Sequence, residues 1–285
     1  MSNWRRTFRT GAATAGAALA TAFLLPAGAV AAAASPGPMA VARGALAGLH
    51  VGAPNHLATG GVTGVLGTTT LGSHNWSGWA DNNSTGDTYT AVSGKWTEPS
   101  ITCIRSTDLE AAAFWTGIDG LSNSTVEQAG TIAICQNGVK SYYSWWEMYP
   151  TNAVQFGPAV NPGDKITSSV TFSGGKYHLK VTDATTPSGS LSTTQACGTT
   201  PCLRASAEWI AERPGVSTGG YAVLPKFGSW KVSAASATSG GTKRVISAYP
   251  DDQIFMVNSS SSLLASPSAL NVAGNSFKVA WKASA

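Results

Sequence analysis

Two glutamates and one glutamine stand in segments whose residue types could catalyse hydrolysis. Glu147 lies in an aromatic run, Glu208 lies in a run that alternates small and polar residues, and Gln128 precedes an Ala-Gly pair. A carboxylate can take a proton from water and pass it to a leaving group. The two glutamates are therefore candidates for acid–base chemistry without a metal, whereas an amide beside a glycine in mid-strand is by itself unremarkable.

The signatures of several other hydrolases are missing. The chain holds no His-Glu-x-x-His zinc pair, no Asp-Thr-Gly or Asp-Ser-Gly turn of an aspartic peptidase, and no Gly-rich phosphate loop. From residue 73 onward only His74 and His178 could serve a Ser-His-Asp triad, and neither lies in a recognisable motif. We therefore expect carboxylate chemistry that needs no metal and no cofactor.

The run Ser141–Pro150 predicts a strand with two different faces. With a period of two, one face is shared by Tyr143, Trp145, Glu147 and Tyr149. This face could belong to an ordinary sandwich core, with its glutamate in a surface salt bridge, or it could line a groove for an extended ligand. The pattern by itself favours the first interpretation.

The run Leu203–Glu212 alternates in the same way. Ala207, Trp209 and Ala211 form an apolar side that suits a core, which sends Glu208 to the opposite, polar side. Acidic residues are depleted inside strands, so a glutamate in mid-strand is either solvent-facing or functional. The pattern by itself favours a solvent-facing side chain.

The segments Phe114–Gly120 and Thr125–Gly130 predict two strands joined by a turn around Asp119. Glu127 and Gln128 are adjacent in the second strand, so their side chains are expected on opposite faces of the sheet.

Short strands account for most of the chain after His74. Runs rich in β-branched and aromatic residues alternate with clusters of Gly, Ser, Asn and Asp, and no long stretch has the apolar period of a helix. We expect residues 73–285 to form one all-β domain, an antiparallel β-sandwich of two packed sheets. The expected strands are Tyr89–Trp96, Ala111–Trp115, Val126–Ile134, Ser141–Tyr149, Lys165–Phe172, Tyr177–Asp183, Leu203–Glu212, Trp230–Ala237, Arg244–Tyr249, Gln253–Val257 and Ser276–Trp281.

Residues 1–34 have the layout of a secretory signal peptide. A basic start with Arg5, Arg6 and Arg9 precedes the apolar stretch Gly11–Leu25, and small residues around Val30 offer cleavage sites. The protein is therefore expected to be secreted, by the general or the twin-arginine route. Residues 35–72, rich in Gly, Ala, Pro and Thr, are expected to be flexible, as a pro-segment or as a linker.

The formal net charge of +4 comes from four arginines, Arg5, Arg6, Arg9 and Arg43. From residue 44 onward, 14 Lys and Arg (18 minus 4) balance 14 Asp and Glu. This balance gives no reason to expect nucleic-acid binding, or membrane binding after signal cleavage, because both need a clustered basic face. We expect a monomer.

Four cysteines follow the leader, an even number that favours two disulfides over metal ligation in an exported chain. Cys197 and Cys202 are close enough in sequence to staple a hairpin loop, which leaves Cys103 with Cys135. Paired Cys-x2-Cys ligands of a zinc site are missing.

Taken together, these segments resemble the glutamic peptidases (eqolisins, peptidase family G1), as a bacterial-type secreted member. The motifs occur in the family's order from residue 75 to 285, and they are Asn75–Gly78, Val92–Gly94, Trp115–Gly120, Gln128–Gly130, Trp145–Pro150, Ala207–Ile210, Phe227–Gly228 and Ala235–Ala237. The resemblance implies a lectin-like, concanavalin A type sandwich whose concave face binds an extended peptide.

The resemblance also implies site residues. It makes Gln128 and Glu208 the catalytic pair of an acid endopeptidase that is insensitive to pepstatin and acts on unfolded polypeptides. It places the substrate cleft at Trp115, Asp119, Trp145, Glu147 and Tyr149. The chain departs from the fungal members at Tyr143, where they carry an Asp, in its cysteine positions and in its lack of net acidity.

Two other functions fit a lectin-like sandwich. A glycoside hydrolase could use Glu147 and Glu208 as its two carboxyls, about 5–5.5 Å apart for retention or about 6.5–9.5 Å apart for inversion. A carbohydrate-binding module would need the aromatic groove but not Glu208. The Gln128 motif favours the peptidase.

Overall fold

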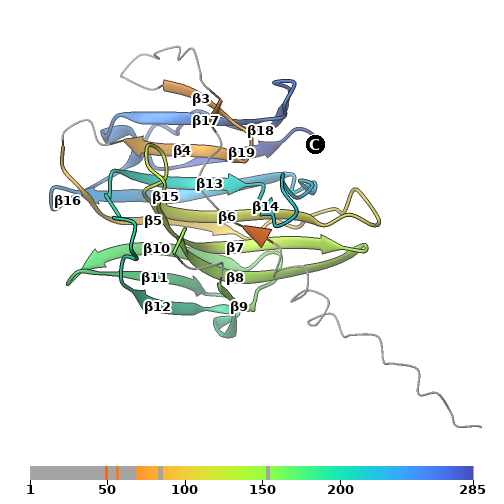
Figure 1. Cartoon of the computed structure of the whole chain (residues 1–285), viewed down its shortest axis with the longest axis horizontal. Helices are drawn as coiled ribbons and strands as arrows, with labels where there is room; N and C mark the ends of the chain where they lie inside the picture. Colours follow the sequence, from red (N-terminus) through yellow and green to blue (C-terminus); the bar gives the residue numbers. More distant parts are fainter. Residues whose placement is uncertain (1–48, 51–55, 58–68, 83–85, 152–154, 285) are drawn as a thin grey trace, which may run out of the picture. The chain divides into compact units, whose positions relative to one another are not determined.

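The computed structural model describes residues 49–50, 56–57, 69–82, 86–151 and 155–284 (Figure 1). The expected signal peptide lies outside the described residues, as does most of 35–72. The described residues form strands and two short 3-10 helices, Pro187–Gly189 and Ile246–Ala248, with no α-helix among them. None of their helices is long and apolar enough to cross a membrane.

The described part of the chain contains nineteen strands. Their bounds are β1 Leu49–His50, β2 His56–Leu57, β3 Thr69–Ser73, β4 Trp76–Asn82, β5 Tyr89–Thr97, β6 Glu110–Ile118, β7 Val126–Gln136, β8 Val139–Tyr149, β9 Gln155–Ala159, β10 Lys165–Ser173, β11 Lys176–Asp183, β12 Leu191–Gln195, β13 Ser206–Glu212, β14 Gly215–Val216, β15 Ser229–Ser239, β16 Thr242–Arg244, β17 Asp251–Val257, β18 Leu263–Pro267 and β19 Phe277–Trp281.

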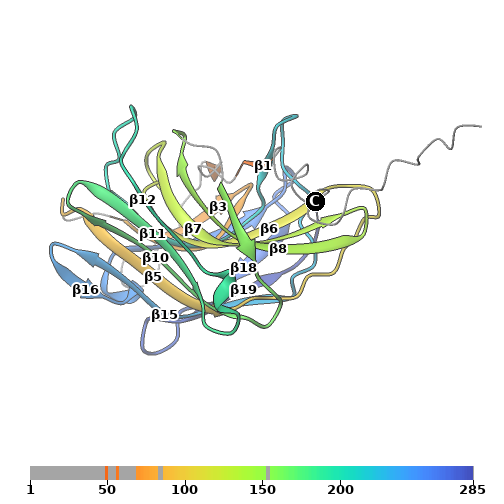
Figure 2. The same ribbon diagram turned by 90° about the horizontal axis from the view of Figure 1, so that it is seen from below.

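These strands form two packed layers that are joined at one side (Figures 1 and 2). The first sheet has the order β9-β8-β7-β6-β13-β4-β17-β3, and the second has the order β12-β11-β10-β5-β15-β16. The first half of β15 pairs with β19, which links the layers through β18 and β17. All strand pairs are antiparallel except β3 with β17. The expected antiparallel all-β sandwich is confirmed, and its lectin-like type stays a prediction.

The main core lies between the two sheets. Ala207, Trp209 and Ala211 are buried there, as the alternation of their strand predicts. Phe114 and Trp230 stack with ring centroids 5.5 Å apart in the same core. Burial of such large rings removes much apolar area from water and is the dominant favourable term in folding.

Three sequence expectations about strands need correction. Arg244–Tyr249 is not a strand, because β16 ends at Arg244 and a 3-10 helix follows. The predicted strand at Leu203 starts only at Ser206, since Arg204 has a φ of 57°, outside the extended region. The sequence patterns also missed β3, β4, β9, β12 and β18, which are short or rich in Gly, Ser and Thr.

Within residues 35–72, the structure describes Leu49 as a buried residue. This side chain is 3% exposed and packs into an apolar cluster on the outer side of the first sheet. Its strand pairs with β14, and β2 pairs with β3, which itself begins four residues before the expected domain boundary at residue 73.

Both expected disulfides are present, Cys103 with Cys135 and Cys197 with Cys202. The first ties the segment before β6 to the end of β7, across a separation of 32 residues. The second closes a loop of five residues just before β13. Both therefore lie next to strands that carry candidate catalytic residues.

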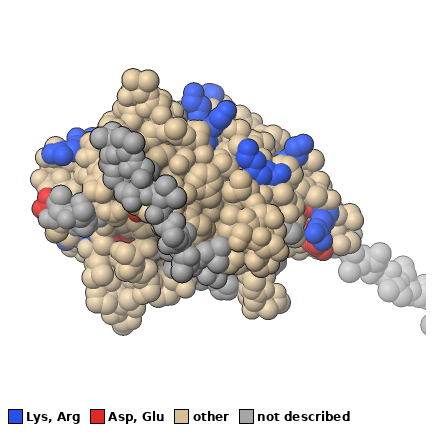
Figure 3. All heavy atoms as spheres, turned by 90° about the horizontal axis from the view of Figure 1, so that it is seen from above, with Lys and Arg blue, Asp and Glu red and all other residues tan. Residues whose placement is uncertain are grey.

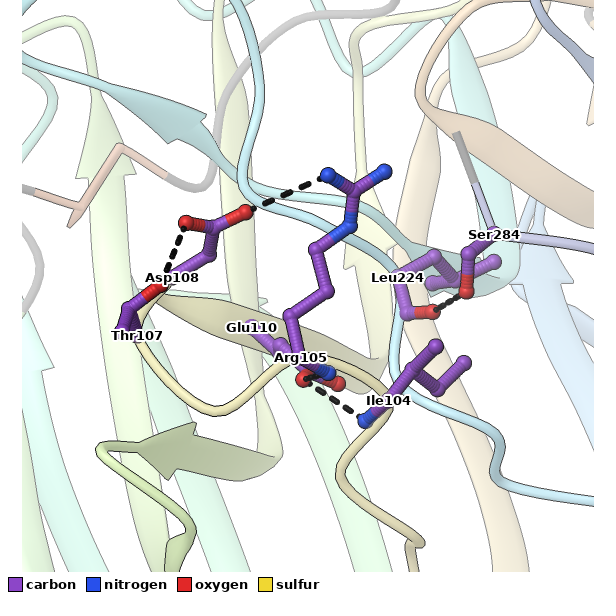
Figure 4. Close-up of polar contacts among 7 residues, drawn as sticks. All are labelled: Ile104, Arg105, Thr107, Asp108, Glu110, Leu224 and Ser284. Atoms are coloured by element: carbon purple, nitrogen blue, oxygen red, sulfur yellow. Dashed lines mark hydrogen bonds and ion pairs between the residues drawn. The ribbon is translucent and has the colours of Figure 1, made fainter.

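Buried carboxylates in this fold are often bound by backbone N–H groups instead of cations. At the start of β6, Glu110 accepts hydrogen bonds from the N–H groups of Ile104 at 2.7 Å and Arg105 at 2.6 Å (Figure 4). Nearby, the Ser284 hydroxyl donates to the carbonyl of Leu224 at 2.8 Å, close to the end of the chain. The two bonds to the Glu110 carboxylate are charge-assisted, and they hold the loop before β6 against the start of that strand.

Candidate active site

The two candidate catalytic residues lie in one cross-strand row of the first sheet. Glu208 of β13 is paired with Gly117 of β6, which is paired with Gln128 of β7, which is paired with Glu147 of β8. Directly paired residues point to the same face, so the three polar side chains share one side of the sheet. Strand pairing brings together neighbours in this row that are 91, 11 and 19 residues apart in sequence.

Gly117 separates the two catalytic candidates. The α-carbons of Gln128 and Glu208 are about 10 Å apart, since two strand spacings separate them. A β-carbon added at Gly117 would lie 2.8 Å from Cζ3 of Trp115 and 3.3 Å from the β-carbon of Gln128. The Trp115 ring therefore lies over Gly117, in the space that a side chain at this position would take.

Gln128 is held by a neighbouring carboxyl group. Its Nε2 donates a hydrogen bond of 3.0 Å to Oε2 of Glu147, and both side chains are buried. Burial raises the pKa of Glu147 well above its ordinary value, proximity to Glu212 raises it further, and the bond from Gln128 lowers it. Glu147 therefore orients the amide, and the interpretation that places it in a surface salt bridge is wrong.

Glu208 is fully buried, so the solvent-facing position favoured by its strand pattern is wrong. Neither of its carboxylate oxygens accepts a well-formed hydrogen bond from a described residue. Burial raises its pKa well above the ordinary value, the Ser206 hydroxyl opposes this, and Asp119, Glu127 and Asp81 add to it. A buried carboxyl that has a raised pKa and few hydrogen bonds is typical of a catalytic acid or base.

Glu212 is a site residue that the sequence reasoning did not single out. It shares the face of Glu208, and its Oε2 accepts a 2.9 Å hydrogen bond from the indole of Trp115. Its Oε1 accepts from the Asn75 amide at 3.4 Å, and Trp76 packs edge-on against the Trp115 ring. The period of two placed Glu212 on this face, so the strand pattern could have found it.

Most of the candidate substrate-binding residues lie on the same face. Trp115 and Trp145 are fully buried in the apolar cluster there, Tyr149 is half-buried at its edge, and Tyr143 is 9% exposed. Leu49 belongs to the same cluster. The face that carries the row is therefore closed in this structure.

Comparison with known proteins decides the family. The family model described as "Peptidase A4 family" matches residues 74–280, which is most of the chain and includes every residue of the row. The chain belongs to the peptidase A4 family. The expected glutamic peptidase class is thereby confirmed, with solved glutamic peptidases among its structural neighbours.

Three similar proteins illustrate this membership of the peptidase A4 family. Aspergillopepsin-2 of Aspergillus niger is 30% identical over 188 residues, which cover 58% of this chain and 66% of the relative, just under two thirds. The crystal structure of aspergilloglutamic peptidase from Aspergillus niger matches with a TM-score of 0.52 at 27% identity, over 61% of this chain and 99% of that one. Scytalido-glutamic peptidase, solved with a transition-state analogue inhibitor, matches with a TM-score of 0.62 at 20% identity, over 73% and 98%.

Asp119 has a position in this peptidase A4 chain that differs from the other cleft candidates. Its carboxylate accepts hydrogen bonds from the N–H groups of Arg204 and Ala205, both at 2.7 Å, and from the Asn123 amide at 2.7 Å. Its own N–H donates to the carbonyl of Ser206 at 3.0 Å. Through these hydrogen bonds Asp119 holds the end of β6 against the start of β13, the strand that carries Glu208.

Two other kinds of site find no support in this family member. Residues Gly215–Gly219 match the Gly-x-Ser-x-Gly pattern of serine hydrolases, but their first two residues form the short strand β14 and the others lie in a turn, with no helix after them. The described residues contain no group of three or more His, Cys, Asp or Glu side chains arranged to hold a metal ion.

Proposed function

We propose that the protein is a secreted endopeptidase that cleaves unfolded polypeptides under acidic conditions with Gln128 and Glu208. The observation that carries this proposal is their shared face, with only Gly117 between them, inside the region matched by a peptidase family. Their burial beside aromatic rings gives a site from which water can be excluded.

Glu208 acts first as a general base. Its carboxylate takes a proton from a water molecule, and the hydroxide oxygen forms a bond to the carbonyl carbon of the scissile peptide. The protonated Glu208 then gives this proton to the peptide nitrogen as the carbon–nitrogen bond breaks. Burial on the closed face raises the pKa of Glu208, so its carboxyl must gain water contact and ionise before it can act as the base at acidic pH.

Gln128 stabilises the negative oxygen of the tetrahedral intermediate. One hydrogen of its Nε2 is donated to Glu147, and the second is directed to the substrate. One such donor contributes about 3–4 kcal/mol to transition-state stability in other hydrolases. The bond to Glu147 fixes which end of the amide faces the developing charge.

The substrate lies across the strands on this face, against Trp115, Trp145 and Tyr149. The indole N–H of Trp145 is buried without a hydrogen-bond partner among the described residues, so it can donate to a peptide carbonyl. Leu49 occupies the same apolar cluster from within residues 35–72. We therefore assign residues 35–72 as a pro-segment and propose that its Leu49 covers the face until the segment is removed.

The acidic working range is supported by where the carboxyl groups lie. Of 14 Asp and Glu residues, 12 are buried, and only Asp87 and Asp108 are not. On the face drawn in Figure 3, Lys and Arg atoms cover more of the surface than Asp and Glu atoms do. Buried carboxyls without cations are stable when protonated, which favours a low pH.

A proteolysis assay tests the proposal. The mature protein should cleave denatured casein between about pH 3 and about pH 6, in the presence of pepstatin or a chelator. Polysaccharides assayed in parallel should stay intact, because Gln128 stands between Glu147 and Glu208 and binds the former. Hydrolysis of a polysaccharide without proteolysis would favour the glycosidase and contradict the proposal.

A further inference from the structure

The outward side of the second sheet, with its neighbour β19, carries only positive charges. It comprises strands β5, β10, β11, β12, β15 and β19, in which no Asp or Glu is exposed. Its exposed basic residues are Lys95, Lys165, Lys176, His178, Lys180, Lys231 and Lys278. We call this surface the lysine face. The zero net charge of the mature sequence concealed it, since the balancing carboxyls are buried elsewhere.

Nothing in the described part of the chain neutralises the lysine face. None of its lysines forms an ion pair with a described carboxylate, and Lys165 instead donates to the Thr97 hydroxyl at 2.8 Å. Lys231 and Lys278 are directly opposite each other on β15 and β19. Like charges in directly paired positions destabilise a sheet, so an anion bound between these two lysines would stabilise it.

Several of these lysines line two adjoining hollows. The first has a volume of about 600 Å³ and is lined by residues that include Lys95, Lys165 and Lys231. The second has a volume of about 310 Å³ and is lined by Lys231 and Lys278 with Asn271 and Ser276. Lys231 lines both hollows, so a long ligand could run from one to the other.

The chemistry of the face selects the class of anion. Its outward residues other than the basic ones are mainly Ser and Thr, for example Thr167, Ser192 and Ser233. The aromatic rings that line the two hollows, Trp96 and Phe277, are buried, and the described strands of the face carry no exposed aromatic ring or arginine, which disfavours single-stranded nucleic acid. Hydroxyl groups and point charges suit a chain that bears both hydroxyls and anionic groups.

We propose that the lysine face binds an anionic polysaccharide and holds the secreted enzyme on a surface rich in such polymers. The face and the catalytic row lie on opposite sides of the two packed sheets, so both can be occupied at once. This proposal does not depend on the peptidase chemistry, because binding is measured without a peptide substrate.

The test is binding of dextran sulfate and polygalacturonate by the mature protein at about pH 5, with neutral dextran and a single-stranded DNA as comparison probes. The triple variant Lys95→Gln, Lys231→Gln, Lys278→Gln should bind both anionic polymers about tenfold more weakly at low salt. The same three positions changed to arginine should retain binding. Casein cleavage should be unchanged in both variants.

A matched control separates the face from net charge. Lys140→Gln, Lys226→Gln, Lys282→Gln removes the same charge from exposed lysines that line neither hollow. This control should bind as the parent protein does. Equal weakening in both glutamine variants, no binding of either anionic polymer, or tighter binding of DNA would each overturn the proposal. Thermal unfolding of the glutamine variants shows whether a loss of binding arises from misfolding.

Discussion

Gln128 and Glu208 extend from the same face of one sheet with only the backbone of Gly117 between them. Neither residue is near the other in sequence, and the pairing of β6 with both β7 and β13 brings them together. In the proposed mechanism the scissile peptide and its attacking water lie at this position, which the Trp115 ring covers in the present structure.

A methyl group added at Gly117 should impair catalysis without unfolding the protein. In Gly117→Ala the new methyl group meets Trp115 and Gln128, which must shift by some tenths of an ångström. We expect kcat/KM on a peptide substrate to fall by about 10- to 100-fold, as misplacement of catalytic groups does in other enzymes. Gly174→Ala, at a turn with open space around it, is a control for mutation at glycine. An unchanged kcat/KM in Gly117→Ala would show that catalysis does not depend on the missing side chain at this position.

The acceptor on Glu147 should matter more than its charge. Glu147→Gln can still present an oxygen to Nε2 of Gln128, whereas Glu147→Leu leaves that buried donor without its partner. We expect kcat to fall by about tenfold or more in the leucine variant, since an unsatisfied buried donor costs about 1–3 kcal/mol. The glutamine variant should stay much closer to the parent. Equal losses in the two variants would contradict the orienting role.

Stability should decrease as pH rises. Burial raises the pKa of Glu98 to about 8 and that of Glu127 to about 10, with smaller contributions from nearby acids. The unfolded chain loses these protons near the ordinary value of about 4.3, while the folded chain keeps them, so unfolding becomes easier above that pH. The free energy of unfolding should fall by about 1.4 kcal/mol per pH unit for each such group.

Thermal unfolding from about pH 3 to about pH 8 measures this trend. Glu98→Gln preserves the shape of the side chain and removes its ionisation, so its melting temperature should fall less steeply with pH. A melting temperature that rises between about pH 4 and about pH 7 would contradict the sign of the effect.

The pro-segment assignment predicts a difference between two forms of the chain. A form that begins at Thr69, the first residue of β3, lacks Leu49 and should cleave a peptide faster than a form that begins at Pro36. Leu49→Asp in the longer form should have the same effect, because a buried charge disfavours docking. Equal rates in all three proteins would show that residues 36–68 do not cover the site.

The strand pattern predicted the all-β fold and the side of each strand to which a residue points, but not which segments pack over that side. Alternation placed Ala207, Trp209 and Ala211 in the core correctly. It could not show that Glu208 is buried, since the apolar cluster on that face draws on Leu49 and on loops remote in sequence. Period and propensity describe one strand at a time, whereas burial depends on its neighbours.

Long-range contacts account for the rest of what the sequence did not reveal. The carboxylate of Asp119 binds backbone groups 85 and 86 residues away, which no local motif encodes. The resemblance to a family implies that Asp119 is a cleft residue, which stays a prediction, and its hydrogen bonds also hold the end of β6 against the segment before β13. Similarly, Arg204 stops β13 from starting earlier through a backbone angle that residue type alone does not predict.

Single-turnover hydrolysis of one peptide substrate by Gln128→Ala and Glu208→Gln tests the central claim most directly. Each substitution should lower the rate of bond cleavage by about 1000-fold or more while the melting temperature at about pH 4 stays near that of the parent. Cleavage by either variant within about threefold of the parent rate would contradict the assignment of the catalytic pair.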